Sequence, residues 1–120
     1  MTQSFHVLST LADLDAALAR AAREPIILFK HSETCGMSLQ AHEEVTATLA
    51  DPAWTTPVYL VSVQEARPVC AAIAQQLGVR HQSPQVLLVD GGQVSWHTSH
   101  LAITVDALFT AAEKYTPAAR

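Results

Sequence analysis

The sequence has 120 residues, a formal net charge of -4 and a hydrophobic fraction of 49%, with 15% charged residues. This length fits one domain, so we expect residues 1–120 to fold as a single unit around a buried core. The seven Lys and Arg residues are scattered along the chain. Phosphate binding needs clustered basic side chains, so we expect no nucleic-acid partner.

Sequence signals for export and membrane insertion are not found. The first residues lack the basic and apolar regions of a signal peptide, and no apolar run approaches the roughly 20 residues of a membrane helix. We therefore expect a soluble, cytoplasmic protein that does not bind membranes. In that reducing compartment Cys35 and Cys70 are expected to be packing residues or reactive thiols rather than a structural disulfide.

The first half of the chain predicts strand, helix, strand and helix in turn. Residues 5–8 indicate a short edge strand, and apolar residues with helical spacing predict a helix over 11–23. The continuous apolar run 26–29 is typical of a strand buried on both faces. After a polar loop over 30–36, apolar residues at four-residue intervals predict a helix over about 36–50.

A second strand–helix pair follows, and it contains the second cysteine. The β-branched run 58–63 predicts a buried strand, and the apolar face of residues 66–77 predicts a helix that ends at Gly78. Cys70 lies on this apolar face, which favours core packing. The alternative is a remote resolving cysteine for Cys35, which would require the helix to move.

The chain ends in a predicted hairpin and a last helix. Residues 86–89 and 93–100 indicate antiparallel strands joined by a turn at 90–92. The final helix covers 105–112 and is capped by Thr104. The resulting order, β-α-β-α-β-α-β-β-α, predicts an α/β fold with a central mixed β-sheet that helices flank on both faces.

Cys35 is the strongest candidate for chemistry, because it follows a buried strand and begins a helix. Unpaired N–H groups and the helix dipole at such a position favour the thiolate. Lys30 and His31 are expected to add positive charge, whereas Glu33 opposes them, and Gly36 leaves room for a disulfide partner. A packing role for Cys35 fits poorly with these polar neighbours.

Ser38 stands where a Cys-x-x-Cys redox motif has its second cysteine. Such a site cannot close its own disulfide, and a mixed disulfide on Cys35 needs an outside thiol for release. Pro84 follows Ser83 and precedes the strand at 86–89. The residues alone favour an ordinary trans bond, whereas a cis bond would present the Ser83 backbone to an extended substrate.

The histidines do not form a metal motif. His31, His81, His97 and His100 lack the spacing of a zinc site, and the last two are expected on opposite faces of one strand. We therefore expect no metal ligands. His81 is a candidate for the lining of the Cys35 site, and a solvated loop position is the alternative.

Three segments together resemble the YtxJ-type monothiol bacilliredoxins, across essentially the whole chain. Residues 29–38 resemble the active loop of that family, residues 78–85 its cis-proline segment, and residues 95–100 its late strand. The resemblance implies a thioredoxin-like fold. It also implies a cis bond between Ser83 and Pro84.

The same resemblance implies an activity, the removal of bacillithiol from mixed disulfides with cytoplasmic proteins. Bacillithiol is a cysteine-containing glucosamine–malate thiol, and it acts as a co-substrate, with no cofactor bound to the chain. Cys35 would attack the capped disulfide, and a second bacillithiol or another reductant would regenerate it. The residues expected to bind substrate or support the thiol are Lys30, His31, Thr34, Gly36, Ser38, His81, Ser83 and Pro84.

Departures from the family keep other functions open. Gly36 stands where the family loop often has proline, Cys70 stands where a small polar residue is expected, and Phe29 stands where thioredoxins have a buried acid. Cys-Gly-x-Ser is also similar to monothiol glutaredoxins, which hold an iron–sulfur cluster with glutathione. The alternatives are thus an iron–sulfur cluster carrier and a non-catalytic thioredoxin-like adaptor. A monomer is the default expectation for the oligomeric state.

Overall fold

The computed structural model describes residues 4–115, and its helices and strands follow the predicted alternation. One short 3-10 helix, η1, is added between the last strand and the last helix. In chain order the elements are β1 (His6–Val7), α1 (Leu11–Ala21), β2 (Ile26–His31), α2 (Gly36–Ala50), β3 (Val58–Ser62), α3 (Arg67–Leu77), β4 (Gln85–Asp90), β5 (Gln93–Ser99), η1 (His100–Ala102) and α4 (Val105–Tyr115).

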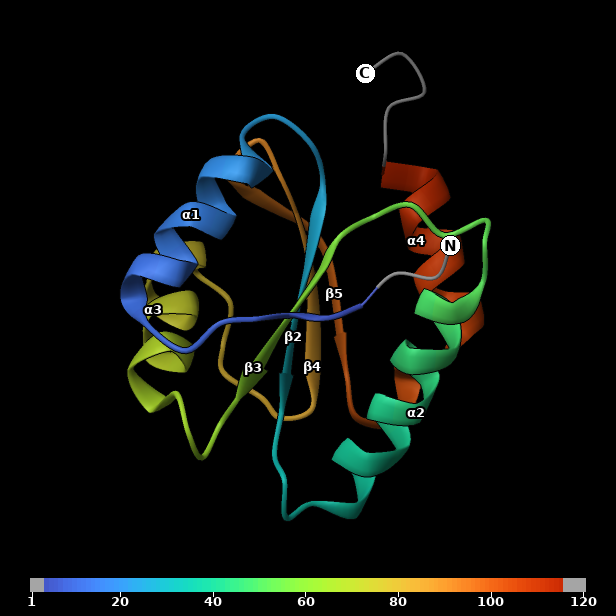
Figure 1. Ribbon diagram of the computed structural model, residues 1–120, viewed down its shortest axis with the longest axis horizontal. Coiled ribbons are helices and arrows are strands. Elements are labelled where there is room, and N and C mark those ends of the chain that lie inside the picture. Colours follow the sequence, from blue (N-terminus) through green and yellow to red (C-terminus); the bar gives the residue numbers. More distant parts are fainter. Residues whose placement is uncertain (1–3, 116–120) are drawn as a thin grey trace.

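The strands form one mixed sheet in the order β1-β3-β2-β4-β5. β1, β3 and β2 run parallel, whereas β4 is antiparallel to both of its neighbours, β2 and β5. Figure 1 shows α1 and α3 on one face of the sheet and α2 and α4 on the other. The expected α/β architecture with helices on both faces is therefore confirmed.

The core has two halves because side chains of a strand alternate between faces of the sheet. Ile26 and Leu28 of β2 pack toward α1 and α3, whereas Ile27 and Phe29 pack toward α2 and α4. All four side chains are fully buried. This two-sided burial explains why the strand reads as a continuous apolar run.

β2 is longer than its apolar run, and this corrects the expected loop over 30–36. Lys30 pairs with Val61 of β3 and with Gln85 of β4, and His31 pairs with Ser62. Pairing with β3 therefore extends the strand through both polar residues, and Lys30 also pairs with β4. By alternation, Lys30 faces α1 and α3, whereas His31 faces α2.

The ends of the other elements follow local signals. Thr10 and Asp13 form the expected capping box of α1, and Thr104 Oγ1 accepts a hydrogen bond from the N–H of Ala107 at the start of α4. Gly78 ends α3 with a φ of 68°, in the left-handed region that glycine tolerates. His100 begins η1 with a φ of 56°. The expectation that it continues the strand of His97 is therefore wrong.

No helix within residues 4–115 has the length and apolar character needed to cross a lipid bilayer.

Candidate active site

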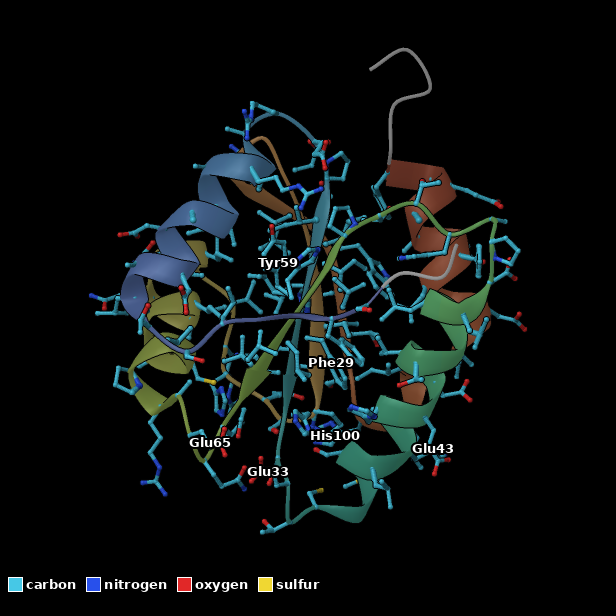
Figure 2. The ribbon with its side chains drawn as sticks, in the orientation of Figure 1. Phe29, Glu33, Glu43, Tyr59, Glu65 and His100 are labelled. Atoms are coloured by element: carbon cyan, nitrogen blue, oxygen red, sulfur yellow. The ribbon has the colours of Figure 1, made fainter. Side chains whose placement is uncertain are left out.

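Cys35 is the N-cap residue of α2, directly after the short loop that leaves β2. Its backbone carbonyl accepts hydrogen bonds from the N–H groups of Ser38 and Leu39, at 3.1 and 3.2 Å. The side chain is partly exposed. The loop lies at the end of the sheet where β2 and β3 finish, where Figure 2 shows Glu33 and Glu65.

The peptide groups of the first turn of α2 lower the pKa of the Cys35 thiol. The largest cause is hydrogen bonding from the Ser38 backbone N–H, followed by that from Met37 and, more weakly, by the Ser38 hydroxyl. Desolvation acts in the opposite direction but is smaller than the first two. The helix N-terminus therefore favours the thiolate form of Cys35, as expected for a thiol at the start of a helix.

Ser38 ties the loop to the helix. Its side chain is fully buried, and its Oγ accepts a hydrogen bond of 3.0 Å from the Ser32 N–H. A hydroxyl in this place cannot form a disulfide with Cys35. Ser38 therefore supports the thiolate and the loop, while the position itself offers no resolving sulfur.

Gln64, just after the neighbouring strand β3, holds the same loop through side-chain hydrogen bonds. Its Oε1 accepts a hydrogen bond of 3.0 Å from the Glu33 N–H, and its Nε2 donates to Ser32 Oγ at 2.6 Å and to Thr34 Oγ1 at 3.3 Å. Sequence reasoning missed this residue. The available signal was that parallel β2 and β3 end at one edge of the sheet, so the residues that follow them meet there.

A pocket of about 250 Å³ opens beside the thiol, lined by His31, Ser32, Glu33, Cys35, Leu39 and His42. His42 was not predicted, although it lies seven residues after Cys35, about two helical turns along α2. The His31 and His42 rings are 5.5 Å apart between centroids. Two imidazoles therefore line the space that a thiol's disulfide partner would occupy.

His31 does not provide the positive charge expected of it. Burial lowers its pKa below the ordinary value, the charge of His42 lowers it further, and Glu33 and Glu65 oppose these effects. The imidazole is therefore mainly neutral at neutral pH. Its two ring nitrogens can still donate and accept hydrogen bonds within the pocket.

Lys30 lies away from the Cys35 pocket, which corrects its expected role beside that thiol. It is fully buried on the face of α1 and α3, and its Nζ is in hydrogen-bond contact with His81 Nδ1 at 3.0 Å. Its charge acts on Cys70. His81 likewise lines another pocket, so neither residue joins the Cys35 site.

The Ser83–Pro84 bond is cis, as the family resemblance implied. The Pro84 carbonyl accepts a hydrogen bond of 3.0 Å from the His100 N–H, which ties this segment to η1. Neither Ser83 nor Pro84 lines the Cys35 pocket. Gly36 does leave open space, because a Cβ added there would meet no atom within 4 Å.

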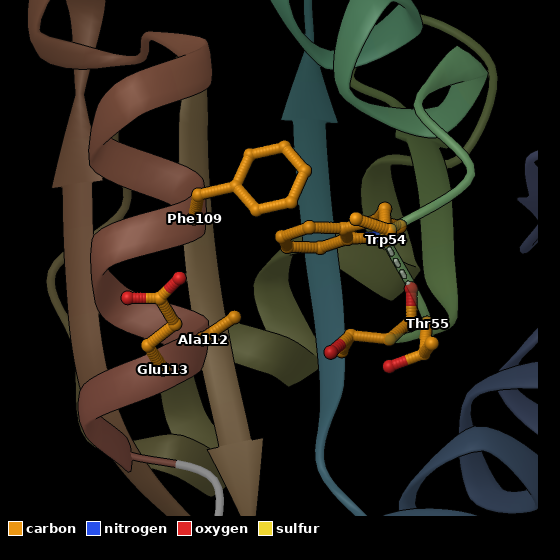
Figure 3. A pocket seen from close by; sticks show the side chains of 7 residues that line it. Trp54, Thr55, Phe109, Ala112 and Glu113 are labelled. Atoms are coloured by element: carbon orange, nitrogen blue, oxygen red, sulfur yellow. Dashed lines mark hydrogen bonds between the residues drawn. The ribbon is translucent and has the colours of Figure 1, made fainter.

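A further pocket lies at the opposite end of the sheet, near the start of β3. It measures about 330 Å³ and lies between Trp54, Thr55 and the α4 residues Phe109, Ala112 and Glu113 (Figure 3). The Trp54 indole N–H donates to the Thr56 carbonyl at 2.6 Å. The lining of this pocket contains no thiol or histidine. We therefore assign the pocket to packing between α4 and the segment that precedes β3.

Within residues 4–115, no three His, Cys, Asp or Glu side chains are arranged to hold a metal ion.

The sheet order, the thiol at the start of α2 and the cis-proline before β4 define a thioredoxin-fold thiol–disulfide oxidoreductase. The family of monothiol bacilliredoxin BrxC matches residues 6–108, and the chain belongs to this family.

Solved structures agree with the fold. One, described as having a thioredoxin fold, is 27% identical with a TM-score of 0.78, and the match covers 88% of this chain and 91% of that one. The Fasciola hepatica thioredoxin is 18% identical, with a TM-score of 0.74 and coverage of 93% and 100%. Thioredoxin NaTrxh from Nicotiana alata is 15% identical, with a TM-score of 0.75 and coverage of 98% and 96%.

Proposed function

We propose that the protein removes bacillithiol from mixed disulfides with cytoplasmic proteins, with Cys35 as the nucleophile and with no bound cofactor. The observation that carries this proposal is the pairing of a thiol of lowered pKa with a buried serine at the resolving position. Membership of the monothiol bacilliredoxin family supports the choice of bacillithiol. The residues that we assign to the reaction lie on one chain, so we propose that the protein acts as a monomer.

The reaction consists of two thiol–disulfide exchanges. The Cys35 thiolate attacks the bacillithiol sulfur of the capped protein, a new S–S bond forms, and the protein sulfur leaves as a thiolate that takes a proton from water. A second thiol then attacks the mixed disulfide on Cys35. It forms a disulfide with the departing bacillithiol and restores the Cys35 thiolate.

Ser38 explains why the second exchange uses an outside thiol. In a dithiol site the second cysteine would attack the mixed disulfide from within the protein. Here the hydroxyl of Ser38 is buried and bonded to the Ser32 N–H, so the mixed disulfide persists until a free thiol arrives.

Different surfaces near Cys35 contact the two halves of the mixed disulfide, the small thiol and the protein. The pocket of about 250 Å³ beside Cys35 accommodates the small thiol, where the His31 and His42 rings offer partners for its hydroxyl and carboxylate groups. Met37 and Leu39 are exposed at 41% and 64% on the first turns of α2. Met37 offers apolar contact to the protein half of the disulfide, whereas Leu39 also lines the pocket of the small thiol.

The test is release of bacillithiol from a model protein whose single cysteine carries it, followed by intact mass spectrometry. We expect the native chain to accept one bacillithiol on Cys35 and to free the model protein. Cys70→Ser is the matched control and should retain the reaction. Release at the native rate by a Cys35→Ser variant would contradict the proposal.

A further inference from the structure

Glu33 gives the Cys35 pocket a negative charge of its own. It lines the pocket of about 250 Å³ together with Cys35, and among residues 4–115 no Lys or Arg side chain joins the lining. Opposite charges attract and like charges repel strongly at short range. The region that receives the small thiol should therefore favour a cationic group near Glu33 and disfavour an anionic one.

The histidine next to this loop does not cancel the charge. Burial lowers the pKa of His31 below its ordinary value, so the imidazole is mainly neutral at neutral pH. The negative charge of Glu33 acts in the opposite direction on the same pKa, so the carboxylate is within electrostatic range of this pocket residue. Glu33 thus remains a negative group without a cationic neighbour in the lining.

The Glu33 carboxylate is also available to a ligand. The backbone N–H of Glu33 donates to Gln64 Oε1 at 3.0 Å, which holds the main chain in place. The side chain is exposed, and within the described part of the chain its carboxylate accepts no hydrogen bond and forms no ion pair. A held backbone with an unengaged carboxylate leaves the charge free to bind a group that enters the pocket.

Glu33 is close enough to Cys35 to contact a thiol that is bonded to it. One residue separates them, so their Cα atoms lie at most about 7 Å apart. In a thiol derived from cysteine, the amino nitrogen is attached two carbon atoms away from the sulfur. When that sulfur is bonded to Cys35, its nitrogen stays within reach of a glutamate side chain that lines the same pocket.

We propose that Glu33 is a specificity-determining residue, which binds a primary ammonium group two carbon atoms from the sulfur of the small thiol. This inference rests on the proposed function, because it concerns the small thiol that Cys35 carries in that exchange. It favours thiols built on a cysteine whose amino group is free. Glutathione lacks such a group, because its cysteinyl nitrogen belongs to a peptide bond.

The experiment measures the reaction of Cys35 with two small disulfides in a Cys70→Ser variant. Cystamine has an ammonium two carbon atoms from each sulfur, and N,N′-diacetylcystamine keeps the nitrogen but loses the charge. The Cys35 thiolate forms a new S–S bond with one half of the probe, and the other half leaves as a thiolate that takes a proton from water. One disulfide replaces another, so the step needs no further oxidant.

Intact mass spectrometry follows each adduct over time, and the ratio of the two rates measures the preference for the ammonium. Glu33→Gln in the same background removes the charge and keeps the shape of the side chain. Because the same two probes are used, their different intrinsic reactivities cancel when the ratios are compared. We expect Glu33→Gln to lower the ratio about threefold, as an exposed ion pair would. Salt at about 1 M should lower the ratio of the parent towards that of Glu33→Gln.

Glu65→Gln is the matched control. Glu65 is exposed and its charge also raises the pKa of His31, but it does not line the Cys35 pocket. Its removal therefore tests general attraction between the protein and a cationic probe, and the ratio should stay at the value of the parent. Circular dichroism and thermal unfolding first establish that each variant is folded.

The outcomes separate this inference from the proposed function. An equal ratio in Glu33→Gln and its parent would overturn the assignment of Glu33, as would an equal fall in Glu65→Gln or a preference that salt leaves unchanged. In those cases Cys35 still exchanges with both probes and the proposed function stands. A folded variant whose Cys35 reacts with neither probe would contradict the proposed function, and this inference with it.

Discussion

At the residue scale, peptide groups rather than cations stabilise the Cys35 thiolate. The Ser38 and Met37 N–H groups are the two largest causes of its lowered pKa, whereas His31 is mainly neutral and Lys30 faces the other side of the sheet. Peptide N–H groups are fixed by the helix and do not titrate. The thiol therefore keeps its acidity throughout the pH range in which the histidines change charge.

Ser38→Ala should weaken both the loop and the thiol. The substitution removes the acceptor for the Ser32 N–H and the hydroxyl that bonds to the Cys35 sulfur. We expect a loss of about 1 kcal/mol in the free energy of unfolding, the usual contribution of one hydrogen bond, and a higher Cys35 pKa. Urea denaturation and ultraviolet titration of the thiolate measure the two effects. An unchanged pKa would show that the hydroxyl contributes nothing to the thiolate.

Lys30 makes the stability of the fold depend on pH. Folding lowers its pKa, so between the folded value and the ordinary value of 10.5 the unfolded chain binds more protons than the folded chain. The free energy of unfolding must then rise with pH across that interval. Lys30→Met should remove this rise and should stabilise the fold by about 1 kcal/mol or more, because a buried charge is lost.

The check is urea denaturation of the native chain and of Lys30→Met at several pH values. Arg80→Gln removes one positive charge at an exposed position and is the control. Parallel stability profiles for the native chain and Lys30→Met would contradict the account of Lys30.

At the element scale, the start of α2 and the end of β3 together hold the active loop. The N-cap side chain of α2 makes no cap hydrogen bond, and the Met37 and Ser38 N–H groups favour the Cys35 thiolate. Gln64, just after β3, holds the loop from the other side through Glu33, Ser32 and Thr34. The thiol is thus positioned by two elements that are adjacent in the sheet but distant in sequence.

Gln64→Ala should loosen the loop without unfolding the core, because Gln64 is exposed and makes its bonds to loop atoms. Amide exchange at Glu33 should become faster, and kcat for disulfide exchange should fall severalfold while the Cys35 pKa stays near its native value. Hydrogen-exchange mass spectrometry and a kinetic assay measure these effects. A variant with native exchange at Glu33 would rule out this role of Gln64.

Gly36→Ala tests whether the open space beside Gly36, at the start of α2, is needed for activity. Alanine is the better helix former by up to about 1 kcal/mol, and an added Cβ meets no atom within 4 Å. We expect slightly higher thermal stability and retained exchange activity. Loss of activity with an intact fold would mean that substrate fills the open space beside Gly36.

Local sequence signals predicted most elements, and non-local pairing explains the exceptions. Thr10 and Asp13 act within one helical turn, so the start of α1 could be predicted from adjacent residues. Lys30 could not be placed, because its position depends on pairing with Gln85, which is far along the chain. Gln64 was missed for the same reason, since only the strand order β3-β2 brings it to the active loop.

At the scale of the whole molecule, the sheet separates two thiols into different environments. Cys35 lies at a helix start with peptide donors and a lowered pKa, whereas Cys70 packs within the α1–α3 half of the core and has a raised pKa. The same α/β layering thus places one thiol at an accessible edge and the other in the core beneath α3.

The fully buried centre of the sheet should carry most of the stability. Leu28→Ala removes a side chain with no exposed surface from the middle of β2, and we expect a loss of about 3 kcal/mol. Leu101→Ala, where the leucine is 58% exposed, is the matched control and should cost under about 0.5 kcal/mol. Urea denaturation compares the two, and equal losses would contradict the assigned core.

The most direct test of the central claim is the pH dependence of Cys35 alkylation by iodoacetamide in a Cys70→Ser variant, followed by mass spectrometry. The account predicts a single modification whose rate reaches half its maximum below the ordinary thiol pKa of about 8.5. A half-maximum at or above that value, or a thiol that reacts only after unfolding, would contradict the assignment of Cys35 as the nucleophile.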